Sequence, residues 1–167
     1  MSARPELMVA PLTRDTLQQG LEWADVVVIG PGLGQDSWGK NALREVENCD
    51  KPMLWDADAL NLLAFNPEKR HNRIITPHLG EAARLLNGNV GAIESDRLLA
   101  ARKLVRRYGG VVVLKGAGTL LAAEDGAVAD VGNAGMASGE WGMYCPVSSA
   151  VCSRKSCRCM MQPVPAA

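Results

Sequence analysis

The stretch Asp25-Val26-Val27-Val28-Ile29-Gly30-Pro31-Gly32-Leu33-Gly34 decides the fold of this chain. Its β-branched run from Val26 to Ile29 predicts a strand that is buried on both faces, which is typical of parallel sheets. The glycines that follow predict a tight turn, and Asp36 or Ser37 can cap a helix that runs to about Asn48. A strand, a glycine-rich turn and a helix in this order are the opening unit of an α/β sheet.

The same alternation continues along the chain. We predict strands at residues 53–56, 73–76 and 111–114, helices at 59–65, 80–86 and 95–108, and a hairpin of residues 119–123 and 127–131 around Glu124-Asp125-Gly126. The inner side of the last helix is predicted to carry Leu98, Leu99, Ala101, Leu104 and Val105. Together these elements predict a mainly parallel sheet with helices on both faces, the α/β class.

Composition limits the class of protein. The chain has 167 residues, of which 47% are hydrophobic, and its 18 basic and 18 acidic residues give a formal net charge of zero. That length and apolar content fit one domain with a core, and the neutral balance argues against a nucleic-acid partner. No apolar run is long enough to cross a membrane, and the N-terminus lacks the apolar core of a signal peptide. We therefore expect a cytoplasmic protein with no membrane partner.

Two motifs follow the first two predicted strands. The glycines of Gly30-Pro31-Gly32-Leu33-Gly34 let backbone N–H groups approach a ligand near a helix N-terminus, although a tight turn without a ligand has the same pattern. Asp56, in Asp56-Ala57-Asp58-Ala59-Leu60-Asn61, stands where open α/β sheets place their sites and could orient a ligand or a hydrated metal. The alternative is a structural motif in which Asp58 caps the next helix.

Two further motifs follow the third and fourth strands. In Thr76-Pro77-His78-Leu79-Gly80-Glu81 the proline ends the strand and presents His78 before a helix, where its imidazole can hydrogen-bond a ligand. A single histidine is more often a surface or core residue, and His71 fits that description. In Lys115-Gly116-Ala117-Gly118-Thr119 the small residues leave room for a nucleotide, and Lys115 and Thr119 can bind phosphate oxygens. The alternative is a plain turn between strand and hairpin.

These motifs, followed by Asn133-Ala134-Gly135-Met136-Ala137-Ser138-Gly139, resemble in order and spacing the ADP/ATP-dependent NAD(P)H-hydrate dehydratase family. The resemblance covers about residues 5–139 and implies a carbohydrate-kinase-like domain with a ribokinase-like three-layer α/β/α fold. It implies that hydrated NADH or NADPH is phosphorylated on its hydroxyl by ADP, or by ATP in some members, and that phosphate is then eliminated. Mg²⁺ would accompany the nucleotide, and the intact family would form homo-oligomers.

The resemblance also assigns roles to residues. Gly32 and His78 would contact the hydrated dinucleotide, whereas residues 115–119 and 133–139 would hold the adenine nucleotide. No residue is expected to bind a metal directly.

The sequence departs from the family pattern at two places. Leu79 replaces the second proline of TPHPGE, which loosens the turn but keeps His78 and Glu81. The family continues SGGMGD, where glycine N–H groups form an anion hole and the aspartate is the general base. This chain has Glu140 at the anion hole and Met143 at the position of the base. Methionine accepts no proton, so no catalytic residue is retained and we predict an impaired or inactive chain.

A shift of reading frame explains the second departure. Codons that encode residues 139–149 can be chosen so that one inserted base after Gly139 yields GGMGDVLSGII, the missing motif and the start of an apolar helix. Residues 140–167 have no strand or helix period, and their C-x6-C-x4-C-x-C pattern does not match the spacing of common zinc sites. We therefore predict a partial dehydratase domain at 1–139 and an out-of-frame, disordered tail at 140–167.

Three hypotheses on function remain open at this point. The first is a dehydratase domain that begins inside the family's usual boundaries and so lacks elements at both ends. The second is a ribokinase-fold kinase of a small alcohol, of the vitamin-precursor type, because GPGLG and TPHxGE also occur there. The third is a non-catalytic nucleotide-binding remnant.

Overall fold

The computed structural model describes residues 10–130 and 159–160. The helices are α1 (Arg14–Trp23), α2 (Ser37–Glu47), α3 (Asp58–Phe65), α4 (Leu79–Leu85), α5 (Val90–Ser95) and α6 (Arg97–Tyr108). The strands are β1 (Val26–Ile29), β2 (Met53–Trp55), β3 (Arg73–Ile75), β4 (Val111–Leu114), β5 (Leu120–Ala123), β6 (Val128–Asp130) and β7 (Cys159–Met160).

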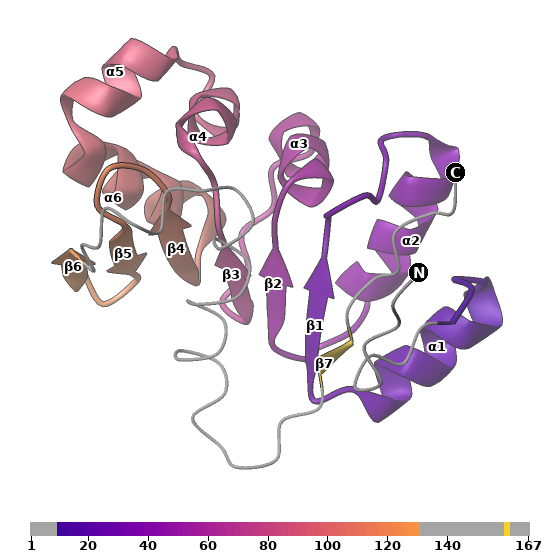
Figure 1. Ribbon diagram of the computed structural model, residues 1–167. Helices are drawn as coiled ribbons and strands as arrows, with labels where there is room; N and C mark the ends of the chain where they lie inside the picture. The colour runs from indigo at the N-terminus through magenta and orange to yellow at the C-terminus, as the bar shows by residue number, and fades with distance from the viewer. Residues whose placement is uncertain (1–9, 131–158, 161–167) are drawn as a thin grey trace, which may run out of the picture.

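The strands form one sheet in the order β6-β5-β4-β3-β2-β1-β7 (Figure 1). Strands β1 to β4 run parallel to one another, and β7 runs parallel to β1. Strand β5 is antiparallel to both of its neighbours, β4 and β6. The connections from β1 to β2, from β2 to β3 and from β3 to β4 each pass through at least one helix, as the alternation in the sequence predicts. The mainly parallel α/β sheet is therefore confirmed, and so is the hairpin of β5 and β6.

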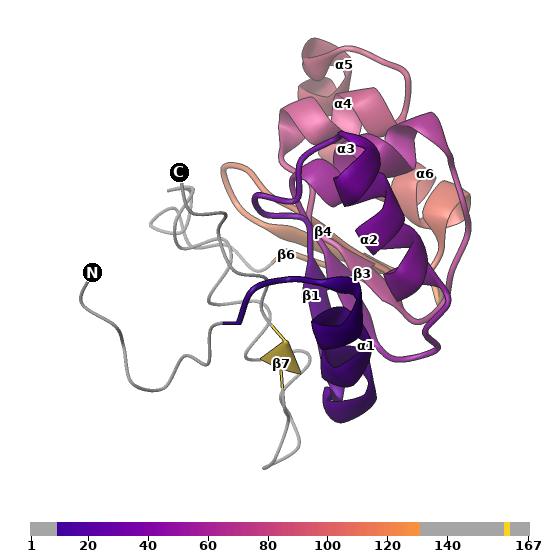
Figure 2. The same ribbon diagram turned by 90° about the vertical axis from the view of Figure 1, so that its right-hand side faces the viewer.

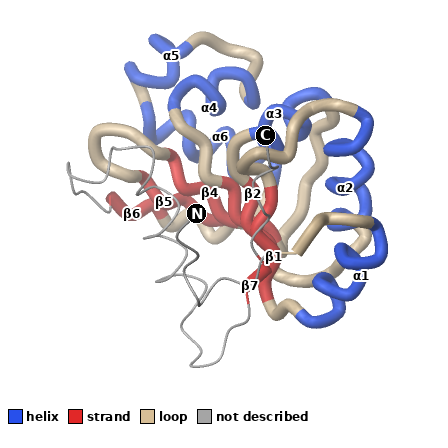
Figure 3. Tube along the Cα trace, turned by 45° about the vertical axis from the view of Figure 1, so that its right-hand side comes forward, coloured by secondary structure: helices blue, strands red, loops and turns tan. Residues whose placement is uncertain are grey.

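All the described helices pack on one face of the sheet, which Figure 2 shows edge-on. Residues two apart on each strand, such as Val27 and Ile29 on β1 or Met53 and Trp55 on β2, share that face and join the helices in one core. The tube in Figure 3 shows the same arrangement, in which the strands lie side by side and the helices lie along one side of them. The second helical layer of a three-layer fold is not supplied by residues 10–130 and 159–160.

The strand predicted at residues 26–29 is present as β1. All four residues of β1 are buried, as the β-branched run predicts. Asp36 caps α2 by accepting a hydrogen bond from the Gly39 N–H at 2.9 Å. The predicted bounds of β2, β3, β4, α3 and α4 hold to within one residue.

The prediction for α6 is wrong at its first turn. Leu98 and Leu99 are 50% and 46% exposed, whereas Ala100, Ala101, Leu104, Val105 and Tyr108 are buried. The helix begins at Arg97, and the Asp96 side chain caps it through the Leu99 N–H at 2.8 Å. From that start, the stripe of residues that faces the sheet passes through positions 100, 104 and 108, so both leucines lie beside it.

Helices α1 and α5 have no counterpart among the predicted elements. Leu17 is the buried residue of α1, with Leu21 half-buried one turn later against the same core, and Ile93 is the buried residue of α5, so the apolar stripe of each helix is short. Their signal lies at the N-terminus instead. Thr13 and Thr16 form a reciprocal capping pair at α1, and Asn89 accepts from the Ala92 N–H at α5.

The predicted tail lies mostly outside the described residues. Of residues 140–167, the structure describes Cys159–Met160, which pair in parallel with Val26 and Val27 of β1. Disorder in the rest of that segment stays a prediction. Within the described part of the chain, no helix has the length and apolar character needed to span a bilayer.

Candidate functional site

The carboxyl ends of the four parallel strands meet at one edge of the sheet. Ile29, Trp55 and Ile75 are partners in register across β1, β2 and β3, and β4 pairs beside them through Val112. Each strand is followed directly by one of the motifs that the sequence singles out, beginning at Gly30, Asp56, Thr76 and Lys115. The fold therefore brings all four motifs to the edge where parallel α/β sheets bind ligands.

The glycine turn after β1 is pressed against the end of β2. Gly30 has φ +129°, and a Cβ atom built on it would lie 1.7 Å from the Asp56 carbonyl oxygen. The Asp56 N–H donates to the Ile29 carbonyl at 3.1 Å, so the two segments cannot separate without breaking the pairing. Gly32 follows at φ +69° and is exposed at the outer end of the turn. Glycine is thus required by the backbone here, and Gly32 remains open to a ligand.

Asp58 fixes this turn from the neighbouring motif. Its Oδ2 accepts a hydrogen bond from the Gly34 N–H at 3.0 Å, and its Oδ1 accepts from Gln35 Nε2 at 3.3 Å. Helix α3 has Ala57 at its N-cap, with no side-chain cap. The alternative in which Asp58 caps this helix is therefore wrong, because its carboxylate is turned toward the β1 loop. Asp58 thus positions the β1 loop instead of a helix end, together with Gln35, which no sequence motif singled out.

Asp56 and Lys115 form an ion pair that joins two motifs. Lys115 Nζ lies 2.8 Å from Asp56 Oδ1 and 3.2 Å from Oδ2, and Oδ1 also accepts from the Ala57 N–H at 2.9 Å. The Asp56 side chain is 9% exposed and the Lys115 side chain 26%. The ammonium thus neutralises a nearly buried carboxylate while part of it still faces solvent. A ligand phosphate would have to share Lys115 with Asp56.

His78 is the N-cap of α4. Its Nδ1 accepts hydrogen bonds from the N–H groups of Gly80 at 3.0 Å and Glu81 at 3.4 Å, and Glu81 Oε2 accepts from the His78 N–H at 2.8 Å. Because Nδ1 is an acceptor, the neutral ring carries its proton on Nε2. That nitrogen lies 3.5 Å from Glu81 Oε1, and the side chain is 54% exposed. His78 therefore caps a helix and still presents a donor to solvent.

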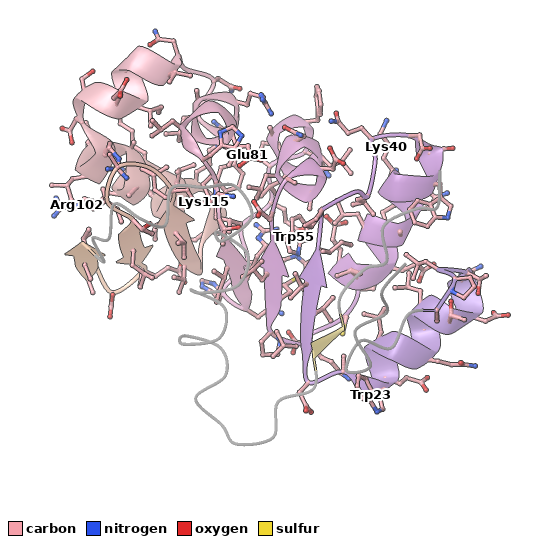
Figure 4. All side chains as sticks on the ribbon, viewed as in Figure 1. Trp23, Lys40, Trp55, Glu81, Arg102 and Lys115 are labelled. Carbon is pink, nitrogen blue, oxygen red and sulfur yellow. The ribbon has the colours of Figure 1, made fainter. Side chains whose placement is uncertain are left out.

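Glu81 is the buried member of this pair. Burial raises the pKa of its carboxyl above the ordinary value, while the His78 N–H and the positive charge of Lys115 act in the opposite direction. The Lys115 N–H also donates to the Pro77 carbonyl at 2.8 Å, which fastens the end of β4 to the histidine motif. Figure 4 shows Glu81 on α4 and Lys115 after β4 at the same edge. Asp56, Lys115, Glu81 and His78 thus form one polar group.

Hollows elsewhere in the described part do not coincide with this edge. One of about 690 Å³ lies between α2 and α3, and another of about 390 Å³ lies between α1 and α2. Neither is lined by a residue predicted to bind the ligand. Within residues 10–130, no three His, Cys, Asp or Glu side chains are grouped to hold a metal ion. Residues 133–139 and Met143 lie outside the described residues.

Comparison with known proteins decides the family. The family model for NAD(P)H-hydrate dehydratase matches residues 1–143. The chain belongs to this family. The dehydratase match covers every motif at the strand ends, and similarity to solved structures confirms the ribokinase-like α/β fold class.

Individual members of the dehydratase family match most of this chain. The bifunctional NAD(P)H-hydrate repair enzyme Nnr of Escherichia coli is 70% identical over 144 residues, which cover 85% of this chain and 28% of that protein. The ADP-dependent (S)-NAD(P)H-hydrate dehydratase of Neisseria meningitidis is 41% identical and shares 80% of this chain and 48% of its own length. This chain therefore spans less than half of either relative.

A solved dehydratase has the same fold. The ADP/ATP-dependent NAD(P)H-hydrate dehydratase of Bacillus subtilis, co-crystallised with ATP and Mg²⁺ and soaked with CoA, superposes with a TM-score of 0.59 at 29% identity. The superposition covers 78% of this chain and 53% of that one.

Proposed function

We propose that this chain carries part of the site of an ADP-dependent (S)-NAD(P)H-hydrate dehydratase, an enzyme of nicotinamide nucleotide repair. The observation that carries the proposal is the Asp56–Lys115 ion pair at the edge where the four strand-end motifs meet. It joins the proposed phosphate-binding segment, which begins at Lys115, to the motif that follows β2. Family membership supplies the reaction that these motifs would serve.

The hydrated dinucleotide would bind beside Gly32 and His78. The turn at Gly32 is exposed and has no side chain, so a ligand can approach its backbone. The Nε2–H of His78 can donate to an oxygen of the hydrate, because Nδ1 is already held by the helix N-terminus. Glu81 accepts a hydrogen bond from the His78 backbone N–H, and its other carboxylate oxygen lies 3.5 Å from Nε2 of the ring.

The adenine nucleotide would bind along Lys115-Gly116-Ala117-Gly118-Thr119. Lys115 would place its partly exposed ammonium near the phosphates while Asp56 keeps it oriented. We include Asn133 to Gly139 in the nucleotide site on the strength of the sequence motif alone. Mg²⁺ would arrive bound to the phosphates, as is usual for this ion, and Asp56 could orient one of its waters.

In the proposed reaction ADP is the phosphate donor. The terminal phosphoryl group of ADP passes to the hydroxyl of the hydrate, whose proton is taken by a base, and AMP leaves. Elimination then breaks the C–O bond to release inorganic phosphate, and the adjacent ring carbon loses a proton to solvent, so that the electrons of its C–H bond restore the nicotinamide double bond. This chain lacks the general base for the first step, because Met143 stands at the aspartate position. Glu140 also brings a negative charge to the anion hole, where phosphate would bind. We therefore propose that the chain as written is inactive or severely impaired.

Two measurements test this proposal. Isothermal titration of the full chain with ADP and Mg²⁺ asks whether the strand-end motifs bind the nucleotide. A turnover assay then follows the return of NADH from its hydrate for the present sequence and for a frame-restored sequence that carries the family's N-terminal segment. The proposal fails if the frame-restored protein phosphorylates a small vitamin-precursor alcohol and leaves the hydrate unchanged.

A further inference from the structure

Arg97, the first residue of α6, holds the loop that follows β4. Its guanidinium donates to the carbonyl oxygens of Ala117 and Gly118, and a longer contact of 3.4 Å reaches the Leu114 carbonyl. Arg97 is only partly exposed, and its Nε atom is buried. A side chain from 20 residues earlier in the chain thus gathers carbonyl groups from both ends of this loop.

The glycine at position 116 is explained by the same contact. A Cβ atom built on Gly116 would lie 2.8 Å from Arg97 Nη2 and 3.1 Å from Arg97 Cζ. Any larger residue would push the guanidinium away from the carbonyls. The small residue therefore makes room for the arginine, on the side of the loop that faces α6.

Peptide geometry determines where the loop's N–H groups point. In a trans peptide the C=O and the following N–H lie in one plane and point in opposite directions. Carbonyls that are drawn toward Arg97 therefore direct the N–H groups of Gly118 and Thr119 to the other side. The preceding peptide shows this rule: the Leu114 carbonyl faces Arg97, and the Lys115 N–H donates to Pro77 on the opposite side.

We infer that Arg97 is a positioning residue for the nucleotide phosphates. It orients the N–H groups of Gly118 and Thr119 so that they can donate to phosphate oxygens, without touching the ligand itself. The planar fork of arginine presents its N–H donors to neighbouring carbonyls in a fixed geometry, whereas the lysine ammonium is a compact charge on a flexible chain. This inference rests on the proposed nucleotide site at residues 115–119.

The test compares Arg97→Ala, Arg97→Lys and the control Arg102→Ala in the full chain. Arg102 lies on the same helix and is exposed, beside the β5–β6 hairpin and away from Lys115 (Figure 4). Backbone NMR order parameters of residues 116–119 without ligand should fall in Arg97→Ala and stay unchanged in Arg102→Ala. The affinity for ADP with Mg²⁺ should fall by about 10- to 100-fold in Arg97→Ala and by less in Arg97→Lys, as expected for lost charge-assisted hydrogen bonds.

Adenosine separates phosphate orientation from general damage, because it has no phosphate. Its affinity, measured by competition, should be the same in all variants. Equal losses for ADP and adenosine, or unchanged loop order in Arg97→Ala, would overturn the inference. If the unmodified chain binds no ADP, the proposed nucleotide site fails, and the order parameters alone decide whether Arg97 positions the loop. Should Arg97→Ala not fold, the same comparison is made with Arg97→Lys.

Discussion

Removal of the Asp56–Lys115 ion pair should destabilise the chain by an amount that the geometry allows us to estimate. At 2.8 Å and an effective dielectric constant of about 20, two unit charges attract by about 6 kcal/mol. Most of this is offset by the loss of hydration of the nearly buried carboxylate. Lys115→Met leaves that carboxylate without its cation and should lower the free energy of unfolding by about 2–3 kcal/mol. Asp56→Asn leaves only the partly exposed ammonium and should cost about 1–2 kcal/mol.

The double variant measures the interaction itself. Urea unfolding followed by circular dichroism on the four proteins of the cycle should give a coupling free energy of about 1–2 kcal/mol. Lys40→Met serves as the control, because Lys40 is exposed on α2 and takes part in no ion pair of the described residues. It should change stability by less than about 0.5 kcal/mol. A coupling within about 0.3 kcal/mol of zero would refute the ion pair and with it the joining of the two motifs.

Three further predictions concern the same edge of the sheet. Gly30→Ala should cost more than about 4 kcal/mol, because the new Cβ would overlap the Asp56 carbonyl. Gly126 also has a positive φ, but no atom lies within 4 Å of a Cβ built on it, so Gly126→Ala should lose about 1 kcal/mol of stability in a thermal melt. Equal losses of stability in the two variants would contradict the steric overlap at Gly30. Because the pKa of Glu81 is raised, its contribution to stability is full below the ordinary glutamate pKa and is lost as pH rises through the folded value. Glu81→Gln keeps an acceptor for the His78 N–H but cannot ionise. The urea midpoint of the variant, relative to that of the native chain, should therefore rise between about pH 4 and pH 8. A relative midpoint that falls over this range would show that the pKa of Glu81 is lowered, and would contradict the prediction. Met143→Asp alone should restore no dehydratase turnover, because Glu140 still places a negative charge at the anion hole; full activity in that variant would disprove the frameshift hypothesis.

The elements with a strong local pattern could be predicted from the sequence. The β-branched runs of β1 and β4 allow few other structures, and the alternation with helices fixes a parallel sheet. Helix α1 was not predicted, because Leu17 and Leu21 make an apolar stripe of only two residues. The inner face of α6 was misplaced because it depends on where the helix begins, and that start is set by the Asp96 cap.

The site was predictable as a set of motifs but not as a set of contacts. Parallel strands bring their carboxyl ends together, so the positions of Asp56, His78 and Lys115 at one edge follow from the order of the motifs. The partners of these side chains depend on loop conformation. Nothing in the sequence distinguishes Asp58 as a helix cap from Asp58 as an anchor of the Gly34 turn. The three carbonyl contacts of Arg97 also depend on packing between distant segments.

A dehydratase assay on two paired sequences tests whether the change of sequence after Gly139 abolishes activity. One protein is the chain as written, and the other restores the family frame after Gly139 and adds the N-terminal segment of the relatives. Both are supplied with hydrated NADH, ADP and Mg²⁺, and the return of NADH is followed by absorbance. We expect turnover by the frame-restored protein and a rate lower by at least about 10⁴-fold for the present chain, since the present chain lacks both the general base and the anion hole. Comparable turnover by the two proteins would contradict this expectation.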